Sequence, residues 1–142
     1  METIKKIQED IIEEFEMLDD WMQKYEYLID LGKDLPVIDE KYKVDNNLIK
    51  GCQSRVWLHA EEKNGKIIYT ADSDAIMTKG IIAILVRTLS YQSPFEIADS
   101  NLEFIEKIGL KEQLSPARAN GLLLMIKQMK LYAIVFKNND EN

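Results

Sequence analysis

The sequence predicts an α+β fold in which a small antiparallel sheet, of about three strands, is covered by helices. Three observations support this. Helical periodicity occurs at both ends of the chain, an Asn-Gly dipeptide separates two short apolar runs in the middle, and strands do not alternate with helices as in a parallel sheet. The chain has 142 residues, 46% of them hydrophobic, so we expect a single domain over residues 1–142.

Two helices are expected before the sheet. Apolar residues at three- and four-residue intervals predict an amphipathic helix over residues 3–18. Residues 1–20 hold eight acids against two lysines, a net charge of -6 out of -7 for the whole chain. Asp20 and Gln23 form a capping box for a second helix, and Gly32 is expected to end that helix in the left-handed conformation.

The sheet is predicted from a hairpin. Residues 56–60 alternate between apolar and polar, Asn64-Gly65 is a strong signal for a two-residue turn, and residues 67–69 supply the returning strand. Since an isolated hairpin is only marginally stable, a third strand is expected to pair with it, from residues 37–39.

Helices with well-marked starts follow the hairpin, and residues 137–142 are expected to form a disordered polar tail. The expected starts are Ser73 or Asp74 for an apolar helix to Leu89, Ser93-Pro94 with Glu96, Ser100 with Glu103 for a helix to Gly109, and Ser115-Pro116.

Charge and hydropathy exclude several classes of protein. No apolar run approaches the roughly 20 residues of a bilayer span, and the N-terminus is too acidic for a targeting peptide. We therefore expect a cytoplasmic protein with no membrane contact. The net charge of -7 argues against a nucleic-acid partner, which normally requires a basic face.

The chain has one cysteine, Cys52, and one histidine, His59. One thiol forms no internal disulfide, and the pair cannot complete a zinc or iron–sulfur site, so no metal or cofactor is expected. His59 lies seven positions from Cys52, which places it on the opposite face if the strand is unbroken. No general base can be assigned to the thiol.

Cys52 lies in a locally basic segment, because residues 41–55 contain four cations and a single acid, Asp45. Nearby cations favour the thiolate, although a lone cytosolic cysteine is often only a small buried apolar residue. A free thiol is about 3% thiolate at pH 7. This fraction suffices for exchange with an activated sulfur of a partner, but not for hydrolysis. Arg118 is a cation in the first turn of the last helix, where it opposes the helix dipole and indicates a partner or a role.

With these residues in view, the sequence resembles the SufE family of sulfur acceptor proteins, from about residue 20 to residue 133. The resemblance is carried by KYEYLIDLGKDLP (24–36), GCQSRVWL (51–58), DSDAIMTKG (72–80) and LSPARANGL (114–122). Departures from the family pattern are small and are expected not to touch the thiol. They are Lys24 for a usual Arg, Met77 and Thr78 for a usual aliphatic pair, and Ala117 for a frequent Ser.

The resemblance implies a SufE/IscU-like fold and a role beside an enzyme rather than as a stand-alone enzyme. A pyridoxal-phosphate (PLP) cysteine desulfurase of SufS type would pass persulfide sulfur to Cys52 and be stimulated by this chain. The sulfur would then go to an iron–sulfur scaffold complex of SufBCD type. PLP would belong to the desulfurase. The residues implied to support Cys52 are Gly51, Gln53, Ser54, Asp74 and Arg118.

The sequence leaves two other interpretations open. The chain could be a non-catalytic adaptor in which Cys52 only packs in the core. It could also be an iron–sulfur scaffold itself, but scaffolds of this fold use several thiolates and this chain has one. Asp72 and Asp74 lack the glycine and distal glutamate of a calcium loop, so helix capping is the better interpretation of that pair.

Overall fold

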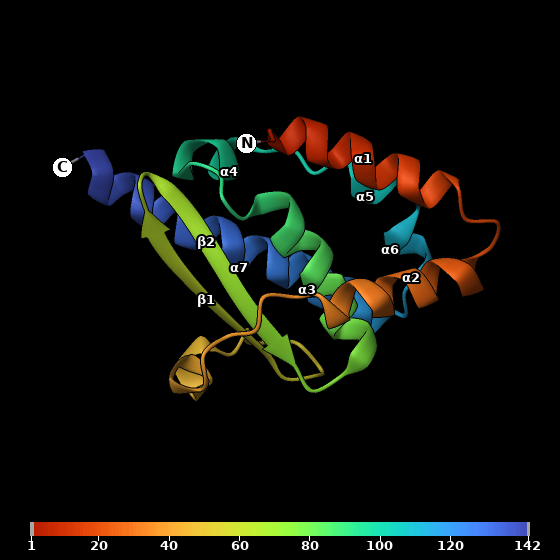
Figure 1. Ribbon diagram of the computed structural model, residues 1–142. Helices are drawn as coiled ribbons and strands as arrows, with labels where there is room; N and C mark the ends of the chain where they lie inside the picture. Colours follow the sequence, from red (N-terminus) through yellow and green to blue (C-terminus); the bar gives the residue numbers. More distant parts are fainter. Residues whose placement is uncertain (1, 142) are drawn as a thin grey trace.

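The computed structural model describes residues 2–141 and confirms the α+β class (Figure 1). A two-stranded sheet is surrounded by helices, as the sequence predicts. The elements are α1 (Ile4–Glu16), α2 (Trp21–Lys33), two short 3-10 helices (Glu40–Tyr42 and Asp45–Asn47), β1 (Val56–Lys63), β2 (Lys66–Ser73), α3 (Ile76–Leu89), α4 (Pro94–Asp99), α5 (Phe104–Lys107), α6 (Leu110–Gln113) and α7 (Pro116–Glu141).

β1 and β2 form the predicted antiparallel hairpin, which runs from the Val56–Ser73 pair to the Lys63–Lys66 pair. Asn64 and Gly65 both have positive φ, 54° and 78°, as a type I′ turn requires.

The expected third strand is not present among the described residues. Residues 37–39 make only one isolated parallel bridge, between Val37 and Ala71. Pro36 has no N–H to donate, and a 3-10 helix begins at Glu40, so this segment is too short to continue the pairing. The prediction of about three strands was therefore wrong by one.

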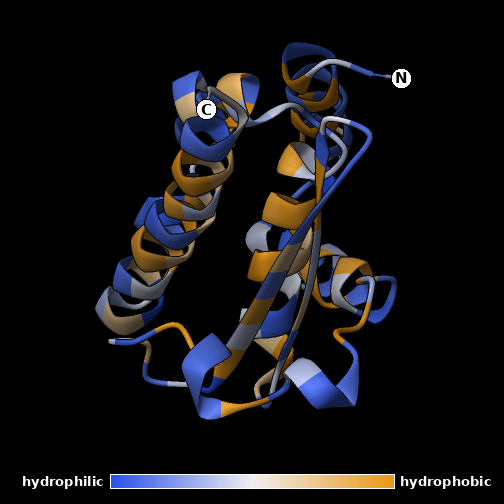
Figure 2. Cartoon of the chain, turned by 90° about the vertical axis from the view of Figure 1, so that its left-hand side faces the viewer, coloured by the Kyte–Doolittle hydropathy of each residue, from blue (hydrophilic) through white to orange (hydrophobic). Residues whose placement is uncertain are grey.

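α3 occupies the centre of the domain, in contact with α2, β2 and α7 (Figure 2). Ten of its residues are buried, which fits the prediction that this helix is apolar nearly all round. The inward side of the hairpin packs onto the same core through Val56, Leu58, Ala60, Ile67, Tyr69 and Ala71.

Gly32 does not end α2 in a left-handed conformation, contrary to the expectation. It lies inside the helix, and its φ is not positive. A Cβ on Gly32 would lie 3.0 Å from the backbone nitrogen of Gly80 in α3. A Cβ on Gly80 would overlap the carbonyl of Leu28, lying 2.7 Å from its carbon atom. The two glycines therefore let the backbones of α2 and α3 touch.

Three of the predicted helix starts are confirmed. Asp20 accepts a hydrogen bond from Gln23 N at 2.9 Å, Ser93 from Glu96 N at 3.2 Å, and Ser115 from Arg118 N at 3.3 Å.

The predicted start at Ser100 was wrong. Its hydroxyl donates to the carbonyl of Ile97 at 2.7 Å, at the end of α4. α5 begins at Phe104, whose N–H donates instead to the side chain of Gln8 in α1 at 3.1 Å. A contact with a distant helix therefore replaces the local cap.

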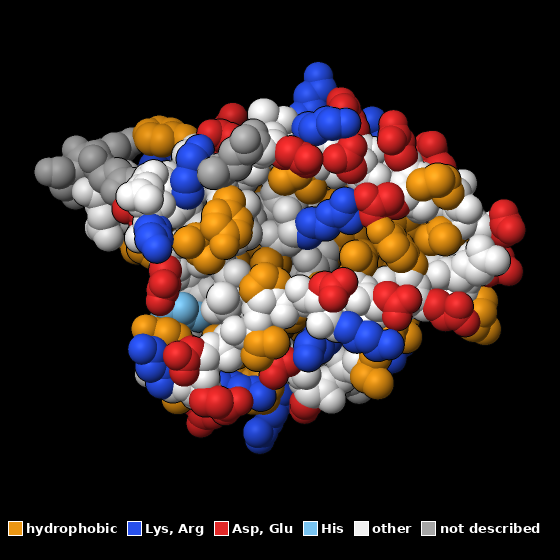
Figure 3. Space-filling model, in the orientation of Figure 1, with side chains coloured by type: hydrophobic (Ala, Val, Ile, Leu, Met, Phe, Trp, Pro, Cys, Tyr) orange, Lys and Arg blue, Asp and Glu red, His pale blue; other side chains and the backbone are white. Residues whose placement is uncertain are grey.

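The acidic first helix, α1, is exposed to solvent on one side and hydrogen-bonded to the rest of the domain on the other. Figure 3 shows its acidic side chains gathered along one edge of the molecule. On the other side of the helix, Glu14 accepts two hydrogen bonds from Arg87, at 2.6 and 2.7 Å, and one from the hydroxyl of Tyr27. The Arg87 guanidinium holds the pKa of the Glu14 carboxyl below its usual range.

α7 continues to Glu141, so residues 137–141 are helical rather than a disordered tail, and residue 142 lies outside the described residues. No proline or glycine follows Gly121, so nothing in the sequence interrupts the helix.

Residues Pro116–Asn139 are long and apolar enough to cross a membrane by length and composition alone. One side of this helix nevertheless packs in the domain core, through Leu122, Met125, Met129 and Ala133.

Candidate functional site

The loop that carries Cys52 begins with a glycine that no other residue could easily replace. Gly51 has a φ of +90°, and a Cβ there would lie 2.8 Å from Cδ1 of Leu124 in α7. The glycine therefore provides both a tight turn and a close approach of the loop to α7.

The thiol of Cys52 is half-buried against the first turns of α7. Its Sγ lies 4.0 Å from the carbonyl oxygen of Gly121, to which the S–H can donate a weak hydrogen bond. A Cβ on Gly121 would lie 3.7 Å from the sulfur, so the glycine leaves room for the thiol against the helix.

Cys52 opens into a pocket of about 230 Å³ between its own loop, α3 and the N-terminus of α7. On the outer side of the same loop lies an open hollow of about 300 Å³, lined in part by Asp45, Lys50 and Arg55. Cys52 therefore borders both the pocket and the open hollow. The inner pocket is lined by Gln53 and Ser54 from the loop, Thr78 and Ile81 from α3, and Arg118 and Gly121 from α7.

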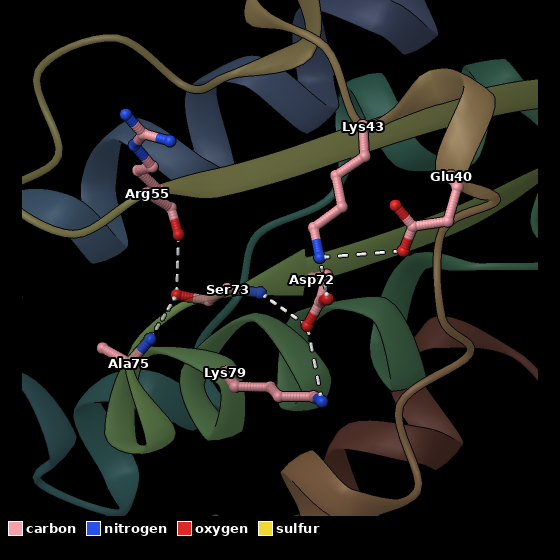
Figure 4. Close-up of polar contacts among 7 residues, drawn as sticks. All are labelled: Glu40, Lys43, Arg55, Asp72, Ser73, Ala75 and Lys79. Atoms are coloured by element: carbon pink, nitrogen blue, oxygen red, sulfur yellow. Dashed lines mark hydrogen bonds and ion pairs between the residues drawn. The ribbon is translucent and has the colours of Figure 1, made fainter.

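Asp74 does not cap α3 and does not line the pocket, contrary to the capping interpretation. It holds the far end of the Cys52 loop, because its carboxylate accepts from the N–H of Arg55 at 3.0 Å. The carbonyl of Arg55 accepts from the Ser73 hydroxyl at 2.8 Å (Figure 4) and from Asp74 N at 3.2 Å. Gly51 at one end and Arg55 at the other therefore set the path of the loop.

The basic segment is not directed at the thiol. Lys43 pairs with Asp72 at 2.9 Å, and Lys79 pairs with the same carboxylate at 3.4 Å (Figure 4). Lys50 and Arg55 are exposed. Burial raises the pKa of the Cys52 thiol, so the expectation that nearby cations favour the thiolate is not supported.

His59 lies away from the thiol on the outer face of the hairpin. Its ring stacks on Tyr42 with centroids 3.6 Å apart, and its Nε2 lies 3.0 Å from the carboxylate of Glu61. It is not placed to act as a base for Cys52, in agreement with its spacing in the sequence.

Arg118 has no acidic side-chain partner within the described part of the chain, although it is an exposed cation at a helix N-terminus. Two departures from the family pattern, Thr78 and Ala117, also line the pocket. Their position beside the thiol was not expected, because the sequence showed only that these two residues differ from the family pattern. Among the residues whose side chains the structure describes, no group of three or more His, Cys, Asp or Glu could hold a metal ion.

The raised pKa of Cys52 leads to a prediction about its reactivity. The rate of alkylation by iodoacetamide should rise with pH through a midpoint above that of a free cysteine, because a raised pKa delays thiolate formation to higher pH. The rate at each pH is measured by stopping the alkylation at set times and determining the alkylated fraction by mass spectrometry. In urea the midpoint should return to the ordinary value, and a native midpoint below that value would contradict the burial effect.

The chain is similar to known proteins over most of its length. The sequence model of the SufE family, described as an Fe-S metabolism associated domain, matches residues 9–133. An uncharacterized SufE-like protein of Synechocystis sp. is 39% identical over 127 residues, covering 89% of this chain and 80% of that protein. SufE-like protein 1, chloroplastic/mitochondrial, of Arabidopsis thaliana is 41% identical over 132 residues, covering 91% of this chain but 35% of that protein.

The fold also has a solved counterpart. The solution structure of a hypothetical protein from Thermus thermophilus superposes with a TM-score of 0.74, covering 89% of this chain and 93% of the other. At 19% identity this match concerns the fold alone.

Proposed function

Since this chain belongs to the SufE family and has a role in iron–sulfur metabolism, we propose that it carries sulfur on Cys52. It accepts persulfide sulfur from a PLP-dependent cysteine desulfurase of SufS type and stimulates that enzyme. It then passes the sulfur to an iron–sulfur scaffold of SufBCD type. The observation that supports this most is a single half-buried thiol on a loop that borders both a pocket and an open hollow.

The chemistry is thiol exchange on a sulfane sulfur. The Cys52 thiolate attacks the terminal sulfur of the donor persulfide, one S–S bond forms on Cys52, and the donor S–S bond breaks. The donor cysteine leaves as a thiolate, and the proton of the Cys52 thiol passes to solvent. The step needs no external oxidant or metal, and PLP belongs to the desulfurase.

The environment of Cys52 suits a carrier that reacts only with a docked donor. Burial raises the pKa of the thiol, so little thiolate is present at neutral pH in the free protein. A partner that contacts the exposed side of the loop, near Lys50 and Arg55, can reach the sulfur through the outer hollow. The inner pocket then shields the attached sulfur from reductants.

Turnover of the cognate desulfurase tests this proposal. With cysteine as substrate, adding the chain should raise the rate of alanine release severalfold, because Cys52 removes the sulfur that otherwise occupies the enzyme. Alanine is measured by amino-acid analysis in the presence of a mild reductant. An unchanged rate, at chain concentrations where binding is demonstrated, would contradict the proposal.

A further inference from the structure

A second pocket, of about 270 Å³, lies between the ends of α2 and α3 and shares no lining residue with the pocket at Cys52. Its volume is close to the lower end of the range for small-ligand sites, roughly 300 to 1,000 Å³, so it suits a molecule with few atoms. The apolar part of its lining consists of Leu31, Leu35, Pro36, Ala83 and Val86. A ligand of this pocket therefore needs an apolar body.

The charges at this pocket favour a cation. Asp34, directly after α2, lines the pocket with an exposed carboxylate that pairs with no cation in the described part of the chain. The neighbouring Lys33 lies 3.4 Å from Asp30 instead. Residues from the last turns of α2 and α3 also line the pocket, and the carbonyl groups at the C-terminus of a helix carry a partial negative charge.

Arg87 is the one cation among the described residues that line this pocket, and its charge is already matched. Its guanidinium donates two hydrogen bonds to the carboxylate of Glu14, from Nη1 at 2.7 Å and from Nη2 at 2.6 Å. An anionic ligand would have to compete with Glu14 for Arg87, whereas a cationic ligand meets an unpaired carboxylate at Asp34. The balance of charge therefore selects a positive ligand.

Tyr91 brings an aromatic ring to the same pocket in a backbone conformation that tyrosine rarely adopts. Its φ is +64°, in the left-handed region, and the residue is 52% exposed. Its N–H donates to the carbonyl of Ile67 in β2 at 2.7 Å, which holds the turn in place. Backbone strain of this kind clusters at ligand sites, and the face of an aromatic ring attracts organic cations.

We propose that this pocket binds a small organic ammonium ion with an apolar body. The apolar body occupies the space between α2 and α3, and the ammonium group lies beside the Asp34 carboxylate and the ring of Tyr91. A neutral molecule of the same shape gains nothing from Asp34, and an anion is repelled by it. The proposal is independent of sulfur transfer, since it uses no residue that lines the pocket at Cys52.

Titration of the full chain with phenethylamine, which is protonated at neutral pH, tests the proposal. The neutral analogue is 2-phenylethanol and the anionic analogue is 3-phenylpropionate. Binding is followed by the backbone amide shifts in two-dimensional NMR spectra. We expect saturable shifts at Leu31, Val86 and Tyr91, with phenethylamine binding roughly threefold or more tightly than either analogue. Absence of saturable shifts at these residues would overturn the proposal, as would an affinity for phenethylamine no higher than that for either analogue.

Two variants separate the contributions of the charge and the ring. Asp34→Asn should weaken phenethylamine binding roughly three- to fivefold and leave 2-phenylethanol binding unchanged. Tyr91→Asn should weaken phenethylamine binding by a similar factor, because asparagine tolerates the left-handed backbone and lacks the ring. The matched control is Asp30→Asn, which removes a carboxylate of α2 that does not line the pocket. If Asp30→Asn weakened binding as much as Asp34→Asn, the effect would come from net charge alone and the proposed site would be wrong.

Discussion

Replacing Cys52 with serine is expected to abolish sulfur acceptance while leaving binding to the desulfurase intact. A serine hydroxyl is close to the thiol in size but does not attack a sulfane sulfur at neutral pH. The loop is held by Gly51 and by the hydrogen bonds to Arg55, so its path does not depend on the sulfur. Alanine release should fall to the rate of the desulfurase alone, and co-elution of the two proteins should persist.

The matched control is His59→Gln, which removes the only imidazole of the chain. Because His59 stacks on Tyr42 and does not line the pocket, this variant should stimulate the desulfurase as the wild type does. If Cys52→Ala retained full stimulation, the thiol would be core packing and the chain would act as a non-catalytic adaptor.

Replacing Gly80 with alanine adds one methyl group and is expected to lower the free energy of unfolding more than replacing Gly121 with alanine does. The new Cβ would overlap the carbonyl of Leu28, which is backbone and cannot rotate away. α2 and α3 must therefore separate, at a cost of about 2 to 3 kcal/mol in the free energy of unfolding, despite the better helix propensity of alanine. Urea unfolding followed by circular dichroism measures this value.

Gly121→Ala is the matched control, since Gly121 is also a buried glycine within a helix. Its Cβ would meet the nearest atom, Cys52 Sγ, at 3.7 Å, an ordinary contact. Helix propensity then predicts unchanged or slightly raised stability, by up to about 1 kcal/mol. If the two variants were equally stable, close packing between α2 and α3 would not explain Gly80.

Features set by a few neighbouring residues could be predicted from the sequence. The Asn64-Gly65 turn and the caps at Asp20 and Ser93 depend on chemistry within four residues, and each was found where expected. Gly32 shows the limit of such reasoning. A local pattern cannot distinguish a helix-ending glycine from one that a distant partner, Gly80, requires.

The candidate site was likewise only partly predictable from the sequence. The motif around Cys52 identified the thiol and its loop, but the pocket also needs α3 and α7, which only the fold brings together. Thr78 was visible in the sequence as a departure from the family pattern, but its position in the lining of the pocket was not. The basic segment was misinterpreted because the sequence could not show that Lys43 pairs with Asp72.

Sulfur from cysteine is expected to become attached to Cys52. The most direct measurement incubates the chain with its cognate desulfurase and sulfur-34-labelled cysteine, then determines the intact mass without reductant. The wild type should gain the mass of one labelled sulfur atom, and the gain should map to the peptide that contains Cys52 and be absent from Cys52→Ser. A wild-type mass that stays unchanged under conditions of active desulfurase turnover would contradict the account.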